Sequence, residues 1–226
     1  MNQLDKKRYL CLHDIPLFSG LSMEFFRQIC LATDKQHLTK GQSLFRQGEV
    51  SNRIYIIKEG YFKLLRITPD GDETILQFVG PGEIIGETAL FRADKAQLAT
   101  AISVGEAKVC SIDHNTFEKI IKNQPNLAWE LIRNLGDRLY GVWEQLSETN
   151  SQTTQEKVLS LMIRMANEHG ESCHEGVRIT IPLTQQEIAS LVGASRVMVV
   201  QAIKELTMQN YLCRENRYYI LKNKCF

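Results

Sequence analysis

The sequence predicts an α+β protein built from an N-terminal antiparallel β-roll of the jelly-roll type, one long helix, and a C-terminal module of short helices and a hairpin. Three patterns support this fold class. Glycines separate short apolar segments through residues 35–115, apolar side chains recur at coiled-coil spacing through residues 128–149, and two short helical segments flank a glycine within residues 184–206. The expected parts are residues 1–115, residues 116–150 and residues 151–226.

The β-roll is predicted from strand-like segments rich in β-branched and aromatic residues, such as RIYIIKEG and YFKLLRITPDGDETILQFVG. Pro69-Asp70-Gly71 is a strong turn signal inside the second segment, because proline presets φ and glycine accepts positive φ. Many short strands at this spacing indicate a sandwich or barrel. A short amphipathic helix is expected before the roll, at residues 21–32.

A short helix is expected at about residues 116–123, followed by a long helix that begins near Pro125 and continues to about residue 148. Apolar residues in the long helix alternate four and three residues apart, which is the a/d spacing of a coiled coil. This predicts a homodimer with an interface formed by Ile132, Leu135, Leu139, Val142 and Leu146. The alternative is a helix packed on its own β-roll, but a globular core usually requires a broader apolar face.

A polar segment, SETNSQTTQ, lacks apolar periodicity and predicts a hinge between domains. Residues 155–169 are expected to form a helix, and VRITIPL alternates like a strand. The segment NYLCRENRYYIL predicts two short strands around Glu215-Asn216, which form a hairpin or wing.

Residues 184–206 have the spacing of a helix-turn-helix. Thr184 and Glu187 form a T-x-x-E capping box, Gly193 stands where the turn requires positive φ, and Ser195 can cap the second helix. Val199, Ile203 and Leu206 are placed to face the first helix. Together with the wing this predicts a winged helix-turn-helix, in which the second helix enters the major groove of double-stranded DNA. A buried helical hairpin is the alternative.

The exposed positions of the two helices have side chains that suit DNA. Arg196 can donate two hydrogen bonds to guanine, Gln201 can pair with adenine in the same bidentate way, and Val197 offers apolar surface to a thymine methyl group, as does Met198. Phosphate contacts are expected from three polar residues at the helix starts. These are Thr184, Gln186 and Ser195.

Composition and charge narrow the function classes. The formal charge is only +1, but residues 194–226 contain six basic and two acidic side chains, which favours an acidic polymer as partner. No apolar run is long enough to span a bilayer and no secretory signal is evident, so we expect a cytoplasmic protein without a membrane partner. Paired carboxylates, a Ser/His/Asp or Cys/His arrangement and a G-x-x-x-x-G-K phosphate loop are all missing, which argues against an enzyme.

Over almost its whole length the chain resembles the CRP/FNR superfamily of bacterial transcription regulators. The residues that carry the resemblance are KGQSLFRQGE (40–49), YIIKEGYFKLLR (55–66), PGEIIGETALF (81–91), the long helix and LTQQEIASLVGASRVMVVQAIKEL (183–206). The resemblance implies a β-roll effector domain, a dimerisation helix, a palindromic operator and RNA polymerase as a partner. An effector would shift the orientation of the two DNA-contacting helices.

The effector site implied by the resemblance departs from the family pattern. In cAMP-binding members the phosphate cassette contains Gly-Glu and, after nine intervening residues, Arg-Ser-Ala. Gly86 and Glu87 match, whereas Gln97 and Leu98 replace the arginine and serine. The polar pair on the dimer helix is replaced as well, by Val142 and Trp143. These changes predict that cAMP is not the effector, because a buried phosphodiester would lose its bidentate arginine contact.

The resemblance leaves other effectors open. An iron–sulfur cluster is not expected, because Cys110 lacks the N-terminal group of three cysteines that the oxygen-sensing branch requires. The alternative is a haem- or redox-based sensor of nitric oxide or oxygen, because FRQGE and ITPDGDETIL resemble the nitric-oxide-sensing members and Cys11 or His13 would be the haem ligand. A surface histidine in a linker is the simpler interpretation of His13. The remaining histidines (His37, His114, His169 and His174) are expected to be structural or exposed. A small organic compound fits the more apolar pocket, and Trp143 filling that pocket is the alternative.

The second helix also differs from the family pattern. Family members commonly carry a glutamate directly after the arginine and a second arginine near the end of the contact region. Those positions are Val197 and Gln201 here. We therefore expect an operator half-site that differs from the TGTGA and TTGAT types of the family, with contacts to thymine methyl groups and adenine. Whether the regulator activates or represses is not indicated.

Overall fold

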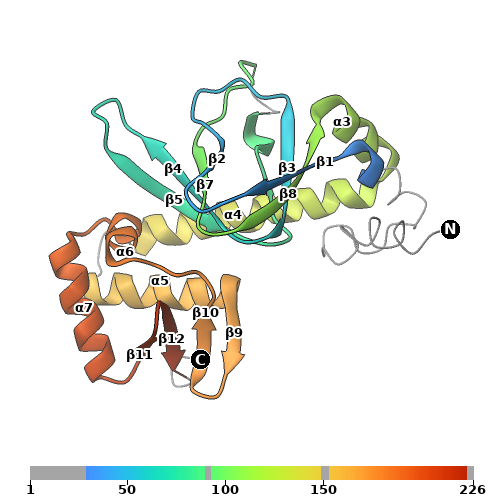
Figure 1. Ribbon diagram of the computed structural model, residues 1–226. Coiled ribbons are helices and arrows are strands. Elements are labelled where there is room, and N and C mark those ends of the chain that lie inside the picture. Colours follow the sequence, from blue (N-terminus) through green and yellow to red (C-terminus); the bar gives the residue numbers. More distant parts are fainter. Residues whose placement is uncertain (1–28, 90–92, 149–152, 223–226) are drawn as a thin grey trace. The chain divides into compact units, whose positions relative to one another are not determined.

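The computed structural model describes residues 29–89, 93–148 and 153–222 (Figure 1). The chain divides into two compact units, residues 1–139 and residues 140–226, and the division falls within the longest helix. The predicted helix at residues 21–32 lies outside the described residues except for a helical segment at residues 29–32. Within the described ranges, none of the helices has the length and apolarity needed to cross a bilayer.

The N-terminal unit contains two antiparallel four-stranded sheets, in the orders β1-β8-β3-β6 and β2-β7-β4-β5 (Figure 1). The strands are β1 (Asp34–Leu38), β2 (Ser43–Phe45), β3 (Arg53–Glu59), β4 (Phe62–Ile67), β5 (Glu73–Val79), β6 (Ile84–Ile85), β7 (Thr100–Ser103) and β8 (Ala107–Asp113). The β4–β5 hairpin closes at the predicted Pro69-Asp70-Gly71 turn, where Gly71 has φ of 89°. The sheet arrangement confirms the predicted β-roll.

Strands β3 and β8 bury side chains on both faces. Because successive side chains of a strand point to opposite sides, Tyr55 and Ile57 enter the interior of the roll, whereas Ile54 and Ile56 contribute to a second cluster on the outer face. That second cluster also contains residues of the two following helices. The continuous run IYII (residues 54–57) is therefore explained by burial on both sides.

Two helices complete the N-terminal unit's outer cluster. Helix α3 (His114–Asn123) begins at the capping residue Asp113, and helix α4 (Pro125–Glu148) has Pro125 at its first position, as predicted. Leu127 and Leu131 of α4 are buried in the cluster, and Leu135 packs partly against it. One face of α4 thus belongs to the core of the β-roll.

The C-terminal unit combines three helices with a four-stranded antiparallel sheet of order β11-β12-β10-β9 (Figure 1). Its elements are α5 (Thr154–His169), β9 (Gly170–Cys173), β10 (Gly176–Ile179), α6 (Gln185–Val192), α7 (Arg196–Met208), β11 (Leu212–Glu215) and β12 (Tyr218–Lys222). Helix α5 contacts both α6 and α7. Strand β9 was not predicted, because GESC is polar and lacks the alternation of a half-buried strand.

Candidate functional site

The α6–α7 pair forms through local interactions that the sequence predicts. The hydroxyl of Thr184 accepts from the backbone N–H of Glu187 at 3.2 Å, and the Glu187 carboxylate accepts from the backbone N–H of Thr184 at 2.9 Å. Gly193 ends α6 in the left-handed region with φ of 64°, and Ser195 caps α7 by accepting from Met198 N–H at 3.3 Å. The capping box, the glycine turn and the second cap are confirmed.

Apolar side chains of α7 fall on two sides of the helix. Val199 and Leu206 are buried against the rest of the unit, and Ile203 is half-buried. Val197 is 79% exposed and Met198 is 52% exposed, so these side chains make no contribution to the core. An apolar surface at the start of this helix is therefore available to a partner.

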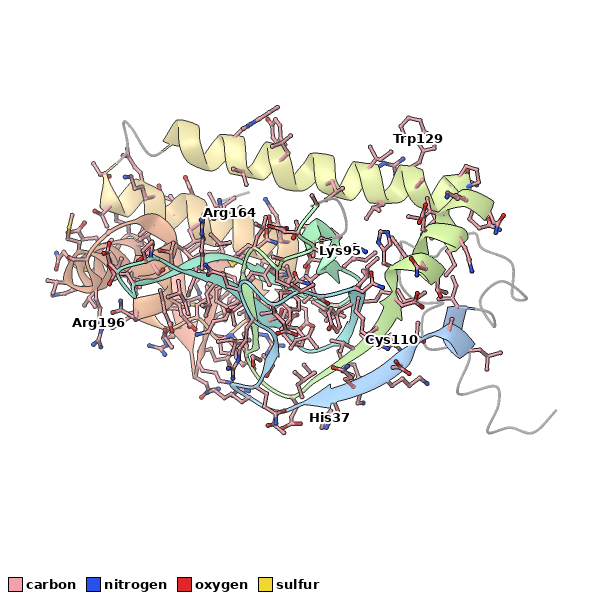
Figure 2. All side chains as sticks on the ribbon, turned by 90° about the horizontal axis from the view of Figure 1, so that it is seen from above. His37, Lys95, Cys110, Trp129, Arg164 and Arg196 are labelled. Carbon is pink, nitrogen blue, oxygen red and sulfur yellow. The ribbon has the colours of Figure 1, made fainter. Side chains whose placement is uncertain are left out.

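The polar residues predicted to contact DNA are also exposed. Arg196 opens α7 and its side chain points away from the helix pair (Figure 2). Gln201 lies further along α7, where its amide nitrogen donates to Glu205 at 2.7 Å. Thr184, Gln186 and Ser195 stand exposed at the starts of α6 and α7. The unit thus places guanidinium, amide, hydroxyl and apolar groups on helices of the same helix-turn-helix.

The wing adds positive charge from Arg214 and Arg217, two of the basic residues counted in the sequence but not placed among the predicted DNA contacts. Strands β11 and β12 join at Asn216, which adopts φ of 55° in the turn. The Arg214 guanidinium lies 5.4 Å from the ring centre of Tyr219, and Arg217 and Arg178 lie 5.2 and 5.7 Å from that of Tyr218. Stacking of this kind restricts long arginine side chains.

The Glu175 carboxylate contacts side chains of both β11 and β12. Glu175 forms an ion pair with Lys222 and accepts a hydrogen bond from the Cys213 thiol at 3.4 Å. The hydrogen bond from Lys222 lowers the pKa of Glu175, and the same bond raises the pKa of Lys222. Burial raises the pKa of Cys213, so this thiol is less reactive as a nucleophile than a free one.

The effector cassette predicted in the β-roll is a buried polar site. Gly86 has φ of 86°, and a Cβ atom there would lie 3.1 Å from the Arg53 carbonyl oxygen and 3.4 Å from Gln97 Nε2. Glu87 is buried in a short 3-10 helix, η2 (Glu87–Ala89). Gln97 is only 3% exposed, and its Nε2 has no hydrogen-bond partner among the residues that the structure describes, whereas Leu98 is 46% exposed. The side chain that lies beside Gly86 is therefore a neutral amide and not a cation.

Two further residues of the predicted effector pocket lie on α4. Val142 and Trp143 are 48% and 59% exposed, and both belong to the C-terminal unit. Their predicted grouping with Gly86, Glu87 and Gln97 remains a prediction.

The outward face of α4 is rich in exposed apolar residues. Ile132 is 57% exposed and Leu139 is 49% exposed, whereas Leu135 packs partly against its own core. Leu146 lies within α4, but its side chain falls outside the described residues. Trp129 and Tyr140 are more than 60% exposed and were missed as interface candidates (Figure 2). A second heptad pattern, which runs through Trp129, Gly136 and Trp143, was the signal for Trp129, whereas Tyr140 lies one position outside it.

Candidate metal ligands do not assemble in the described part of the chain, where no group of three or more histidine, cysteine or acidic residues can hold a metal ion. Cys110 is 1% exposed and belongs to the outer core cluster, as predicted for a strand residue. His37 pairs with Glu106 at 3.0 Å on the surface. Cys11 and His13, the candidate haem ligands, lie outside the described residues.

A β-roll followed by a long helix and a winged helix-turn-helix defines a two-module DNA-binding regulator. Comparison with protein families agrees with this class: residues 35–124 match the Cyclic nucleotide-binding domain, and residues 156–224 match the Crp-like helix-turn-helix domain. The chain belongs to the CRP/FNR superfamily of transcription regulators, which are not enzymes.

Individual relatives cover nearly the whole chain. The CRP-like cAMP-activated global transcriptional regulator of Mycobacterium tuberculosis is 27% identical over 207 residues, which is 92% of each chain. The anaerobic regulatory protein of Bacillus subtilis is 22% identical over 90% of this chain and 86% of its own. Among solved structures, the c-di-GMP-responsive regulator CLP of Xanthomonas campestris has a TM-score of 0.74 at 18% identity, covering 89% of this chain and all of its own, and supports the fold.

Proposed function

We propose that the protein is a dimeric, sequence-specific regulator whose affinity for operator DNA is controlled by an effector or signal at the β-roll. The observation that carries the DNA-contacting part is the exposed surface of α7, where Arg196, Val197 and Gln201 are available while Val199 and Leu206 form the core beneath. Groups that match guanine, thymine and adenine in the major groove thus lie on one recognition helix.

The dimer is supported by the exposed face of α4. Ile132, Leu139 and Val142 are about half exposed, and burying them against a second copy would remove apolar surface from water. A parallel pair of these helices is symmetric, so the two recognition helices would contact two equivalent half-sites. The operator is accordingly expected to be palindromic, and RNA polymerase is the expected further partner of a regulator bound at a promoter.

The experiment for DNA binding starts from selection of operators out of a random duplex library by the full chain. Affinity for the selected duplex and for a scrambled duplex is then measured by fluorescence anisotropy at several salt concentrations. We expect tighter binding to the selected duplex at every salt concentration and a steep fall with salt, because phosphate contacts release counterions. Equal affinities for both duplexes would contradict sequence-specific regulation, and selected half-sites of the TGTGA type would contradict the expected change in specificity.

The effector is proposed to be a compound other than cAMP. A cyclic phosphate carries a negative charge, and its burial without a cationic partner is costly. In this cassette the position of the family arginine is filled by the neutral amide of Gln97, and Leu98 offers no hydroxyl. A neutral, largely apolar compound suits these residues better.

Calorimetric titration of the full chain with cAMP tests this part separately. We expect no binding at micromolar concentrations and no change in DNA affinity at saturating cAMP. Micromolar binding that strengthens operator affinity would contradict the proposal for the effector and leave the proposal for DNA binding standing.

A further inference from the structure

Glu205 lies one helical turn after Gln201 on α7, and the two side chains are joined. Gln201 Nε2 donates a hydrogen bond to Glu205 Oε1 at 2.7 Å. Gln201 is exposed, whereas Glu205 is half-buried and belongs to the following turn of the helix. The hydrogen bond therefore restrains the exposed Gln201 amide from the C-terminal direction, one turn further along α7.

We propose that Glu205 is a positioning residue that fixes the orientation of the Gln201 amide and thereby sets a preference for adenine over guanine in the operator. The inference rests on the proposed function, in which α7 enters the major groove. It concerns a residue that would touch no base itself and would act through Gln201.

The chemistry of the pair determines which end of the amide faces the groove. A carboxylate oxygen accepts hydrogen bonds and donates none, so it can pair only with the nitrogen end of the Gln201 amide. Rotating the amide by half a turn would bring its oxygen against the carboxylate of Glu205, and two acceptors repel each other. Glu205 thus keeps one N–H engaged and leaves the carbonyl oxygen and the other N–H of Gln201 available.

The available groups match adenine and conflict with guanine. Adenine presents the N6 amino donor and the N7 acceptor in the major groove, so it can satisfy both the oxygen and the remaining N–H of Gln201. Guanine presents two acceptors, O6 and N7, and the fixed carbonyl oxygen would face one of them. A freely rotating amide could turn both hydrogens toward guanine, which means that the restraint from Glu205 provides the discrimination.

A purely structural role for the pair makes a different prediction. Side-chain pairs four residues apart on a helix stabilise it by only about 0.2–0.5 kcal/mol. Such a contribution would change the thermal stability slightly, but it would act equally on complexes with every duplex. The ratio of affinities for adenine and guanine at one position therefore separates positioning from helix stabilisation.

The experiment begins by locating the base that Gln201 contacts. Anisotropy titrations of the selected operator and its single-base variants are performed with the full chain and with Gln201→Ala, and the contacted position is the one where this variant loses its preference. Glu205→Leu and Glu205→Gln are then compared at that position. Both changes remove the same charge, but only the glutamine retains an acceptor for Gln201 Nε2.

We expect the adenine-to-guanine affinity ratio to fall at least about fivefold in Glu205→Leu, which corresponds to the lower end of a base contact's discrimination. Glu205→Gln should lie between this variant and the wild type. Its amide oxygen can still accept from Gln201 Nε2, but after turning, its amide nitrogen can donate to the Gln201 carbonyl oxygen and so permit the other orientation. Glu215→Gln on the wing removes an equal charge away from this pair and should leave the ratio unchanged.

An unchanged ratio in Glu205→Leu would overturn the inference, as would equal losses in the two Glu205 variants, which would assign the effect to charge. A Gln201→Ala protein with unaltered base preferences would overturn it as well. In each of these cases the wild-type chain still distinguishes the operator from scrambled DNA, so the proposed function stands. Failure of the wild type to distinguish them would instead remove the proposed function itself.

Discussion

The helix-turn-helix and the effector cassette differ in where they place their polar side chains. In the C-terminal unit, Arg196 and Gln201 project from a helix whose core lies beneath them. In the N-terminal unit, Gln97 is 3% exposed and lies beside a glycine with positive φ. The first set of hydrogen-bonding groups is exposed, whereas the second includes an amide nitrogen that is enclosed by protein and has no hydrogen-bond partner in the described part of the chain.

Because of this difference, residue types alone indicate more about what the exposed side chains bind than about what the buried amide binds. An exposed arginine or glutamine on a recognition helix keeps the chemistry of its free side chain, so the base it prefers follows from its donors and acceptors. A buried amide depends on the atoms packed around it, because an unsatisfied donor costs free energy unless a ligand or rearrangement supplies an acceptor. DNA-contacting residues can therefore be inferred with more detail than the effector.

The largest expected effect concerns the exposed site. Arg196→Ala should lower the affinity for the selected operator by about 1–3 kcal/mol per half-site, because the bidentate contact with guanine is lost. Arg196→Lys keeps the charge but not the fork of donors, and should recover non-specific binding while discriminating poorly between operators. Anisotropy titrations with selected and scrambled duplexes measure both quantities. Specific binding retained in Arg196→Ala would show that the guanine contact lies elsewhere.

The next effect concerns the backbone of the buried site. Gly86→Ala should destabilise the N-terminal unit by about 1–3 kcal/mol, because an L-residue is strained at φ of 86° and its Cβ would lie 3.1 Å from the Arg53 carbonyl oxygen. Gly71→Ala is a matched control, since Gly71 has φ of 89° and a Cβ there would meet nothing within 4 Å. Urea unfolding should show a larger loss of stability for Gly86→Ala than for Gly71→Ala, because only the first variant brings a Cβ atom close to a carbonyl oxygen. Equal unfolding midpoints for the two variants would contradict this expectation.

The helix-turn-helix could be predicted in detail because its determinants are local. Thr184 with Glu187, Gly193 and Ser195 each act within four residues of their own position, so short-range hydrogen bonds and φ preferences suffice. The position of Cys110 in a buried strand followed similarly from its apolar neighbours. The order of the strands in the two sheets was not predicted, since pairing joins distant segments.

The face of α4 shows why other details could not be predicted. Two heptad patterns run along α4 and share Ile132 and Leu139. Between these residues one pattern uses Leu135 and the other uses Gly136, two positions that differ by about 100° around the helix. Sequence spacing alone does not decide which of them packs against the β-roll. In the structure Leu135 contacts the outer cluster and Trp129 is exposed, because Leu127 and Leu131 direct that side of α4 inward.

A smaller effect is expected from the buried amide itself. Gln97→Met has similar volume and removes an Nε2 donor that has no partner within residues 29–89, 93–148 and 153–222, so the free energy of unfolding should stay equal or rise by about 1 kcal/mol. Gln97→Glu would place a carboxylate in the same buried position and should lower the stability. Urea unfolding of the ligand-free chain measures both. A clear loss of stability in Gln97→Met would mean that the amide makes a contact worth more than its burial costs.

The smallest expected effect is a difference in pH dependence between the helix cap of α3 and that of α7. Asp113 caps α3 by accepting from Thr116 N–H at 3.0 Å, whereas Ser195 caps α7 with an uncharged hydroxyl. Replacing either residue by alanine should cost about 1 kcal/mol at neutral pH. Only the carboxylate cap should depend on pH, because hydrogen bonds from Thr116 lower the pKa of Asp113 in the folded state.

The sign of this dependence follows from the lowered pKa. The Asp113 contribution is fully present above the unfolded aspartate pKa of about 3.9 and is lost as the pH falls through the lower folded value. The stability difference between the wild type and Asp113→Ala should therefore shrink below about pH 4, whereas the cost of Ser195→Ala should stay constant through the same range. Hydrogen exchange of peptides that cover α3 and α7 reports on each cap separately. A constant difference for Asp113→Ala down to the lowest pH would mean that the carbonyl oxygen of the protonated acid caps α3 as well as the carboxylate does.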